Sequence, residues 1–231
     1  MSGLGELAKR WGLSERQIEQ LALMLDLLAS DEGAPSSVRG GAALDVHVAD
    51  SLSALALEPV AAAGAIADIG SGAGFPGIVL AIALPNASVA LVESLARKCA
   101  FLERALDVAG VQNARIVNAR AEEWSQGLGE NDLVTARAVA PLAVLCEYAA
   151  PLLDLGGALV AWKGEVSAEE ADGGRAAALV LGLRSNGAVR SEPYAGSVAH
   201  HLHLYTKVAR TPDGYPRRSG MARKRPLGGS G

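Results

Sequence analysis

Apolar residues in the first part of the chain recur at helical spacing, and they predict two helices. Residues 14–29 place their apolar side chains on one face, and Ser14 begins the S-x-x-Q pattern of a capping box. A cluster of Gly, Pro and Ser at 31–41 indicates a break. A second helix is predicted over 42–57. We therefore expect an N-terminal helical extension over residues 1–60.

Beyond this extension, short apolar runs alternate with helical stretches, and D-L-G-G at 154–157 indicates a turn. This alternation predicts an α/β domain over 61–209 with a parallel, doubly wound sheet that ends in a hairpin. The predicted strands are 65–69, 89–93, 114–118, 132–139, 158–163, 187–194 and 201–208. The predicted helices between them are 75–84, 95–110, 121–128, 141–153 and 167–183.

Charge is distributed unevenly along the chain. The net charge of the 231 residues is −4, yet residues 210–231 hold six Arg and Lys residues against Asp213 alone. A basic C-terminal tail on an acidic body has two interpretations, a solvated segment or an arm that binds phosphate groups. Composition alone leaves both interpretations open.

The two cysteines and the apolar runs exclude several classes of protein. Cys99 and Cys146 lie far apart, without metal-binding or redox spacing, so we expect a reducing compartment and no metal. The N-terminus has no apolar core of a signal peptide, and the apolar run 77–84 is too short to span a bilayer. A cytoplasmic protein with no membrane partner is the expectation.

A glycine-rich segment, D-I-G-S-G-A-G-F-P-G at 68–77, follows the first predicted strand. From Gly72 it has the G-x-G-x-x-G spacing of a dinucleotide site, and from Asp68 it has the D-x-G-x-G spacing of a methyl-donor site. Pro76 has no N–H to give to a phosphate. Asp68 would repel a pyrophosphate but suit the cationic part of S-adenosylmethionine. The segment favours S-adenosylmethionine over NAD, and a tight turn without a ligand is the remaining alternative.

Three later polar residues are candidates for the same site. Glu93 ends the second strand, where a carboxylate accepts hydrogen bonds from the ribose hydroxyls of either cofactor. Glu122 follows the third strand and suits an adenine amino group, although a carboxylate that stabilises a helix N-terminus is an equal alternative. Arg137 lies in the apolar fourth strand, where a buried arginine needs a partner.

Motifs that are missing narrow the methyl acceptor. The fourth strand ends in T-A-R-A-V-A-P, without the D/N-P-P-Y/F pattern of enzymes that methylate exocyclic amines. Cys146 lies within a predicted helix with no adjacent proline, and we interpret it as a core residue rather than a nucleophile. A site that has neither this motif nor a cysteine nucleophile suits an acceptor atom that is already nucleophilic, such as N7 of guanine. Holding donor and acceptor in line then supplies the rate gain.

Together these segments resemble a known family, the small-subunit (16S) ribosomal RNA guanine-N(7) methyltransferases, also called glucose-inhibited division protein B. The resemblance covers about residues 42–228. Its segments are H-V-A-D-S at 47–51, D-I-G-S-G-A-G-F-P-G-I at 68–78, L-V-E-S-L-A-R-K-C-A-F-L at 91–102, D-L-V-T-A-R-A-V-A-P-L at 132–142, A-W-K-G at 161–164 and the tail at 211–228.

The resemblance implies methyl transfer from S-adenosylmethionine to N7 of a guanine in 16S rRNA, in the small ribosomal subunit. It implies a class I S-adenosylmethionine-dependent methyltransferase fold, Rossmann-like with a seven-stranded sheet. With the residues discussed above, the expected cofactor contacts are Gly70, Gly72, Phe75, Glu93, Ala121, Glu122 and Arg137. The expected RNA contacts are Lys163, Arg217, Arg218, Arg223, Lys224 and Arg225.

His47, Asp50 and Ser51 lie at i, i+3 and i+4 on one face of the second predicted helix. Spacing alone indicates a local polar network, and the resemblance implies an edge of the active site. No role is assigned to the 31–41 loop, because it lacks the N-L-T segment that many family members carry. We expect a monomer whose tail binds RNA without affecting the cofactor. The alternatives are an RNA-binding ribosome assembly factor and an NAD-dependent oxidoreductase.

Overall fold

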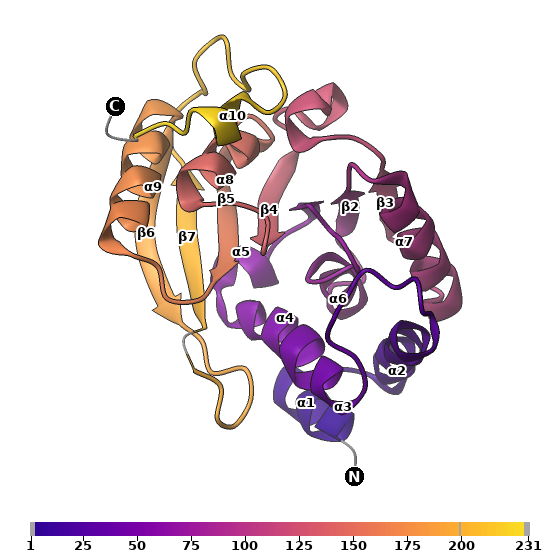
Figure 1. The fold of residues 1–231 in the computed structure, drawn as a ribbon. Helices are drawn as coiled ribbons and strands as arrows, with labels where there is room; N and C mark the ends of the chain where they lie inside the picture. Colours follow the sequence, from indigo (N-terminus) through magenta and orange to yellow (C-terminus); the bar gives the residue numbers. More distant parts are fainter. Residues whose placement is uncertain (1–2, 199, 229–231) are drawn as a thin grey trace.

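The computed structural model describes residues 3–198 and 200–228 and has one seven-stranded sheet at its centre (Figure 1). The strand order is β3-β2-β1-β4-β5-β7-β6, in which β7 runs antiparallel to both neighbours and the other pairs are parallel. This confirms the predicted sheet and its terminal hairpin. The strands are β1 (Ala65–Ile69), β2 (Ser88–Val92), β3 (Ala114–Val117), β4 (Asn131–Arg137), β5 (Leu153–Lys163), β6 (Leu183–Arg190) and β7 (His201–Lys207).

Helices cover both faces of the sheet. The α-helices are α1 (Gly3–Trp11), α2 (Glu15–Ser30), α3 (Gly41–Ala43), α4 (Asp50–Ser53), α5 (Glu58–Ala61), α6 (Gly77–Ala83), α7 (Ala96–Ala109), α8 (Leu142–Ala149), α9 (Ala168–Val180) and α10 (Met221–Lys224). Two hydrophobic cores result, one shared with α6, α7 and the N-terminal helices and one shared with α8 and α9. Successive strand residues alternate between them: Ile66 and Leu133 face the first core, and Ala67 and Val134 face the second.

The N-terminal helices form an outer layer that packs on α6 and α7. The predicted capping box of α2 is confirmed, because Ser14 Oγ accepts from Gln17 N and the Gln17 side chain accepts from Ser14 N. Gln17 Nε2 also donates to the Ile82 carbonyl at 2.7 Å, which ties α2 to the end of α6. None of the helices within 3–198 and 200–228 is long and apolar enough to cross a membrane.

Sequence patterns missed or misplaced several elements. Helix α1 was not predicted, since its glycines weaken intrinsic helix formation, and burial of Leu7 against the first core stabilises it instead. The predicted helix 42–57 is helical throughout most of its length but irregular, with a π-helical turn at Leu44–Ala49 and a 3₁₀ turn at Ala54–Ala56. The turn predicted at 154–157 is wrong. These residues belong to β5, where the register shifts against β4 and Gly156 has a φ of +87°.

Candidate active site

The glycine-rich loop connects β1 to α6, and its glycines have different functions. Gly70 has a φ of +71°, and a Cβ there would lie 2.6 Å from Val139 Cγ2, so this position needs glycine. A Cβ on Gly77 would lie 2.4 Å from Leu91 Cδ2, which means that Gly77 permits close packing of α6 on β2. Gly70 also lines the cavity described below.

Asp68, whose carboxylate was expected to suit the cationic part of the cofactor, does not line that cavity and has protein partners instead. The side chain is 1% exposed; its Oδ1 accepts from Thr135 Oγ1 at 2.8 Å and its Oδ2 accepts from Gly77 N at 3.2 Å. Burial raises the pKa of Asp68 to about 6. Asp68 thus occupies the amide at the start of α6, which is the group that a dinucleotide site would offer to a pyrophosphate.

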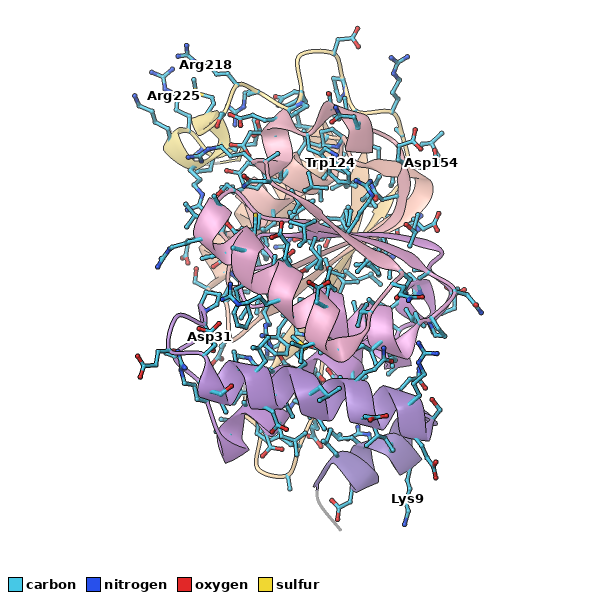
Figure 2. The ribbon with its side chains drawn as sticks, turned by 90° about the vertical axis from the view of Figure 1, so that its right-hand side faces the viewer. Lys9, Asp31, Trp124, Asp154, Arg218 and Arg225 are labelled. Atoms are coloured by element: carbon cyan, nitrogen blue, oxygen red, sulfur yellow. The ribbon has the colours of Figure 1, made fainter. Side chains whose placement is uncertain are left out.

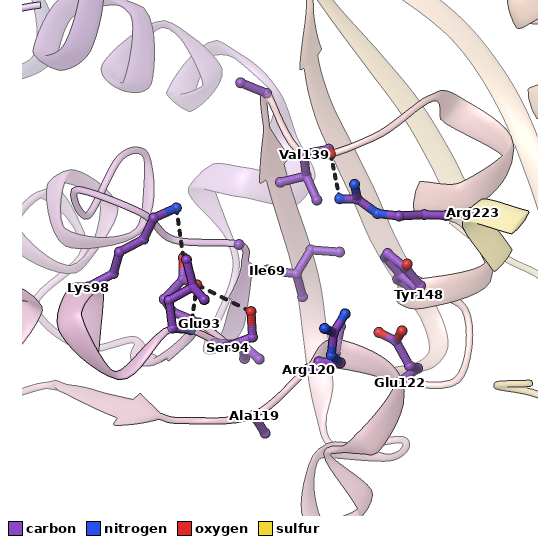
Figure 3. Close-up of a pocket in the computed structure, with 15 residues that line it drawn as sticks. Ile69, Glu93, Ser94, Lys98, Ala119, Arg120, Glu122, Val139, Tyr148 and Arg223 are labelled. Atoms are coloured by element: carbon purple, nitrogen blue, oxygen red, sulfur yellow. Dashed lines mark hydrogen bonds and ion pairs between the residues drawn. The ribbon is translucent and has the colours of Figure 1, made fainter. Parts of the chain in front are cut away.

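A cavity of about 230 Å³ lies at the carboxyl ends of β1, β2 and β4 (Figure 3). We call it the cofactor cavity. Figure 3 shows Glu93 and Lys98 on one side of it, and Glu122, Tyr148 and Arg223 on the other. Its lining residues are Ile69, Gly70, Val92, Glu93, Ser94, Leu95, Lys98, Ala119, Arg120, Ala121, Glu122, Ala138, Val139, Tyr148 and Arg223.

Glu93 is the most constrained acidic group of this cavity, with only 4% of its surface exposed. Its Oε2 accepts from Gly72 N at 3.1 Å, and its Oε1 accepts from Leu95 N at 2.9 Å. Lys98 Nζ lies 3.6 Å from Oε2. The carboxylate therefore joins the glycine loop to the start of α7, and its remaining lone pairs can accept hydrogen bonds from a ligand.

The lining chemistry fits the adenosine part of S-adenosylmethionine. Glu93 offers a carboxylate for ribose hydroxyls, and Glu122 offers a second carboxylate for an adenine amino group. Val92, Leu95 and Val139 supply apolar walls for the adenine ring. Of the expected cofactor residues, Gly70, Glu93, Ala121 and Glu122 line the cavity, whereas Gly72, Phe75 and Arg137 do not.

Phe75 and Arg137 belong instead to a cluster with His47 and Asp50. The Phe75 ring stacks on His47 with ring centroids 4.3 Å apart, and the Arg137 guanidinium lies 5.5 Å from the same ring. Arg137 Nη2 lies 2.9 Å from His47 Nδ1, and Nη1 donates to the Val46 carbonyl at 2.8 Å. Arg137 Nη1 also forms an ion pair with Asp50 Oδ2 at 3.1 Å. This ion pair satisfies the need of a buried arginine for a partner.

The cluster fixes the tautomer of His47. Because a guanidinium can only donate, His47 Nδ1 must accept, and its Nε2–H donates to Ser36 Oγ at 2.9 Å. Burial and the nearby Arg137 lower the pKa of His47 to about 4. Ser36 lies in the 31–41 loop, to which sequence patterns assigned no role, and it holds His47 in place.

This gives a pH prediction. Since the folded protein disfavours the imidazolium, the unfolded chain binds more protons between the folded and the ordinary pKa of His47, and stability falls as pH falls through that range. From about pH 7 to about pH 4.5 this residue should cost about 2–3 kcal/mol of unfolding free energy. Urea unfolding of wild type and His47→Asn across this range checks it, and parallel pH curves would contradict it.

A second cavity, of about 510 Å³, adjoins the cofactor cavity. Both are lined by Ala138, which follows β4 and has a φ of +57°. Asp50 faces this second cavity, whereas Ser51 is fully buried and donates to the His47 carbonyl at 2.6 Å. The lining residues are Asp50, Arg137, Ala138, Trp162, Lys163, Gly164, Val198, His200, His201 and Leu202.

The C-terminal segment, residues 210–228, packs on the body between α8 and the cofactor cavity. Arg217 forms a bidentate pair with Glu147, at 2.7 Å from Nε to Oε1 and 2.5 Å from Nη2 to Oε2, and Glu147 is 1% exposed. Gly220 N donates to Glu122 Oε1 at 3.0 Å. Arg223 lines the cavity and donates to the Val139 carbonyl at 2.8 Å. This segment is therefore part of the cofactor cavity.

Of the six residues expected to contact RNA, Arg223 lies at the cofactor cavity, and the other five fall into two groups. Arg217 is engaged with Glu147, and Lys163 pairs with Glu170 at 2.7 Å. Arg218, Lys224 and Arg225 are exposed, and Figure 2 shows the side chains of Arg218 and Arg225 projecting outward at one end of the molecule. Cys146 is a core residue, as expected, because it is fully buried and burial raises its pKa to about 12.

Sequence patterns gave no role to several residues of the two cavities. Tyr148 comes from the C-terminal end of α8 and lines the cofactor cavity, and Trp162 donates its indole N–H to the Asp50 carbonyl at 3.1 Å. His200 Nδ1 lies 3.1 Å from Asp50 Oδ1. Trp162, at the carboxyl end of β5, and His200, just before the antiparallel β7, lie at the edge of the sheet where the parallel strands end, and ligands bind at that edge in open α/β sheets.

Comparison with known proteins defines the class. The fold is that of class I S-adenosylmethionine-dependent methyltransferases. Cofactor-bound Rv0187 from MTB matches with a TM-score of 0.57 at 21% identity, over 81% of this chain and 89% of that one. A SAM dependent methyltransferase from Aquifex aeolicus matches with a TM-score of 0.55 at 13% identity, over 74% of this chain and 94% of that one.

The family follows from sequence. The model of the family described as rRNA small subunit methyltransferase G matches residues 34–192. Proteins named Ribosomal RNA small subunit methyltransferase G are 44% identical in Rubrobacter xylanophilus, over 80% of this chain and 73% of the relative, and 38% identical in Chloroflexus aggregans, over 96% of both. The chain belongs to this methyltransferase family, as the sequence motifs indicated.

Proposed function

We propose that this protein transfers a methyl group from S-adenosylmethionine to N7 of a guanine in 16S rRNA, within the small ribosomal subunit. The observation that carries the proposal is the cofactor cavity, where Glu93 and Glu122 face apolar walls while Asp68 occupies the amide of Gly77. That arrangement suits an adenosine and keeps the Gly77 amide at the start of α6 from binding a phosphate. The choice of small-subunit ribosomal RNA as the methyl acceptor follows from the name of the relatives.

The chain's own residues position both partners. Glu93 and Glu122 hold the adenosine, and Gly70 keeps the backbone close to it. Arg137 does not line the cofactor cavity, but its contacts hold the side chains of Asp50 and His47 in place. When bound, the cofactor supplies an electrophilic methyl group on a sulfonium. No general base is required, since N7 of guanine carries a lone pair and no proton, so orientation supplies the rate gain.

The exposed cations suit an RNA backbone. Arg218, Lys224 and Arg225 project from the same C-terminal segment that contributes Arg223 to the cofactor cavity. Phosphate contacts by such residues make affinity fall with rising salt concentration. We propose that these three side chains bind rRNA and that the protein acts as a monomer in the cytoplasm without a resident metal.

Two measurements test this function against its alternatives. Calorimetry should detect binding of S-adenosylhomocysteine and none of NAD; binding of NAD alone would support an oxidoreductase instead. Labelled methyl from S-adenosylmethionine should then appear on small subunits purified from a strain that lacks the gene. Normal subunit binding with bound cofactor but no label would support an assembly factor. Naked 16S rRNA, assayed in parallel, identifies which form is the substrate.

A further inference from the structure

The second cavity has the properties of a ligand site. Asp50 is 4% exposed and Trp162 is 5% exposed, yet both face the cavity. His201 Nδ1 is buried and has no hydrogen-bond partner among residues 3–198 and 200–228. Buried polar atoms without partners are rare in folded proteins. His201 lines the same cavity, so the wall of this cavity contains a polar group that the described residues leave without a partner.

Its position relative to the cofactor cavity identifies the ligand as the methyl acceptor. The second cavity shares a lining residue, Ala138, with the cofactor cavity. Methyl transfer requires donor and acceptor atoms to meet at near-contact distance. Resting on the function proposed above, we infer that the second cavity receives the target guanine and that Asp50 recognises its N1–H and 2-amino edge.

The chemistry of Asp50 selects between purines. Guanine and adenine both have a nucleophilic N7, so a guanine-specific enzyme must distinguish them at another edge. Guanine presents two N–H donors at N1 and N2, which a carboxylate can accept together, whereas adenine presents an acceptor at N1 that a carboxylate repels. Because N7 lies on the opposite side of the purine from the 2-amino group, a guanine held this way leaves its N7 free.

The polar contacts around Asp50 allow guanine to replace one of them. Oδ2 is held by Arg137 at 3.1 Å, while Oδ1 lies 3.1 Å from His200 Nδ1. The side chain of His200 is 27% exposed, and its other contact is with Tyr194 in the 191–198 loop, whose hydroxyl lies 3.4 Å from His200 Nε2. Release of Oδ1 therefore moves groups of the surface loop rather than of the core. Guanine N–H groups would replace that contact, and Lys163, 19% exposed at the cavity wall, offers a donor for O6.

Such a base must leave its stack to enter the cavity. Enzymes that act on one base of a nucleic acid extrude it into a pocket and read its Watson–Crick edge. Aromatic side chains commonly stack on bases extruded from RNA. Trp162 and His201 provide aromatic surface around the cavity. The site described here therefore fits a single extruded purine rather than a paired one.

Nucleotide binding to the protein saturated with S-adenosylhomocysteine tests the inference. GMP should bind about 10–100-fold more tightly than AMP, the discrimination that a bidentate contact supplies. IMP, which keeps N1–H but lacks the 2-amino group, should lie between them. Asp50→Asn should abolish the preference for GMP, and the matched control Asp154→Asn, at an exposed carboxylate in another cavity, should keep it. NMR titration provides the affinities.

Equal affinities for GMP and AMP, or no binding of GMP at millimolar concentration, would overturn the inference, as would an Asp50→Asn protein that retains the preference. His200→Ala keeps the test valid if Asp50→Asn does not fold. Removing this competitor for Oδ1 should strengthen GMP binding, and weaker binding would overturn the exchange. If subunits accept labelled methyl while GMP and AMP bind alike, only the inference fails. If no methyl is transferred, the proposed function fails.

Discussion

Glu93→Ala is expected to weaken binding of S-adenosylhomocysteine by about 1–3 kcal/mol, the cost of losing hydrogen bonds to a charged acceptor. The substitution removes the carboxylate proposed for the ribose hydroxyls, and it also releases Gly72 N and Leu95 N from their common acceptor. The loop and the start of α7 then lose the group that joins them. Isothermal titration calorimetry gives the affinity directly.

Glu123→Ala is the matched control, because Glu123 neighbours Glu122 and does not line the cavity. It should leave affinity unchanged. Glu93→Gln keeps one acceptor and should give an intermediate loss. An unchanged affinity in Glu93→Ala, in a protein whose Tm equals that of wild type, would remove Glu93 from the cofactor site.

Arg217→Ala is expected to destabilise the protein by about 3–5 kcal/mol, since it leaves a buried carboxylate without its partner. Glu147 is 1% exposed and Arg217 is its bidentate partner. The change should also release the segment that carries Gly220 and Arg223, so affinity for S-adenosylhomocysteine should fall as well. Urea unfolding and calorimetry measure the two effects.

The double variant Arg217→Met/Glu147→Leu separates packing from charge. Replacing both members of a buried ion pair by apolar residues of similar size is often neutral, so the double variant should recover most of the stability. Arg218→Ala, at an exposed neighbour, should change neither stability nor cofactor affinity. A stability loss in Arg217→Ala below about 1 kcal/mol, as for exposed ion pairs, would contradict the account of this segment.

The C-terminal segment connects the two proposed binding events. The sequence indicated a tail that acts on RNA alone. Instead, Arg223 and Gly220 contact the walls of the cofactor cavity, while Arg218 and Arg225 project outward. RNA phosphates bound to the outer side chains and cofactor bound inside would therefore both stabilise one arrangement of this segment. The earlier expectation that the tail leaves cofactor affinity unchanged does not fit these contacts.

Most of the fold was accessible from sequence because its signals are local. Strand β1 begins and ends where the apolar run predicts it, and helix α2 begins at its capping box. Strand β5 continues through Gly156 because Leu153 and Ala158, on either side of D-L-G-G, both pair with β4, and the segment between them forms a bulge. Helix α1 forms because tertiary packing outweighs its weak propensity. These differences come from contacts that a sequence window does not contain.

The candidate site was predicted only in part, because several of its contacts join residues that are far apart in the sequence. Positions after strand ends placed Glu93 and Glu122 at the cofactor cavity, and the family resemblance placed Ala121 there. The orientation of Asp68 depends on Thr135, and the role of Arg217 depends on Glu147, 70 residues away in sequence. No spacing rule relates such partners, so Asp68 was assigned to the cofactor and Arg217 to RNA. The contact between Asp50 and His200 spans 150 residues and was likewise beyond sequence patterns.

The central claim is methylation of guanine N7 in 16S rRNA, and locating the methyl group tests it most directly. Small subunits from a strain lacking the gene would be incubated with the protein and labelled S-adenosylmethionine, and their 16S rRNA would be cleaved chemically at 7-methylguanine. The account predicts one cleaved position that appears only with active protein and carries the label. Label without cleavage would contradict the N7 assignment, and absence of label would contradict methyl transfer itself.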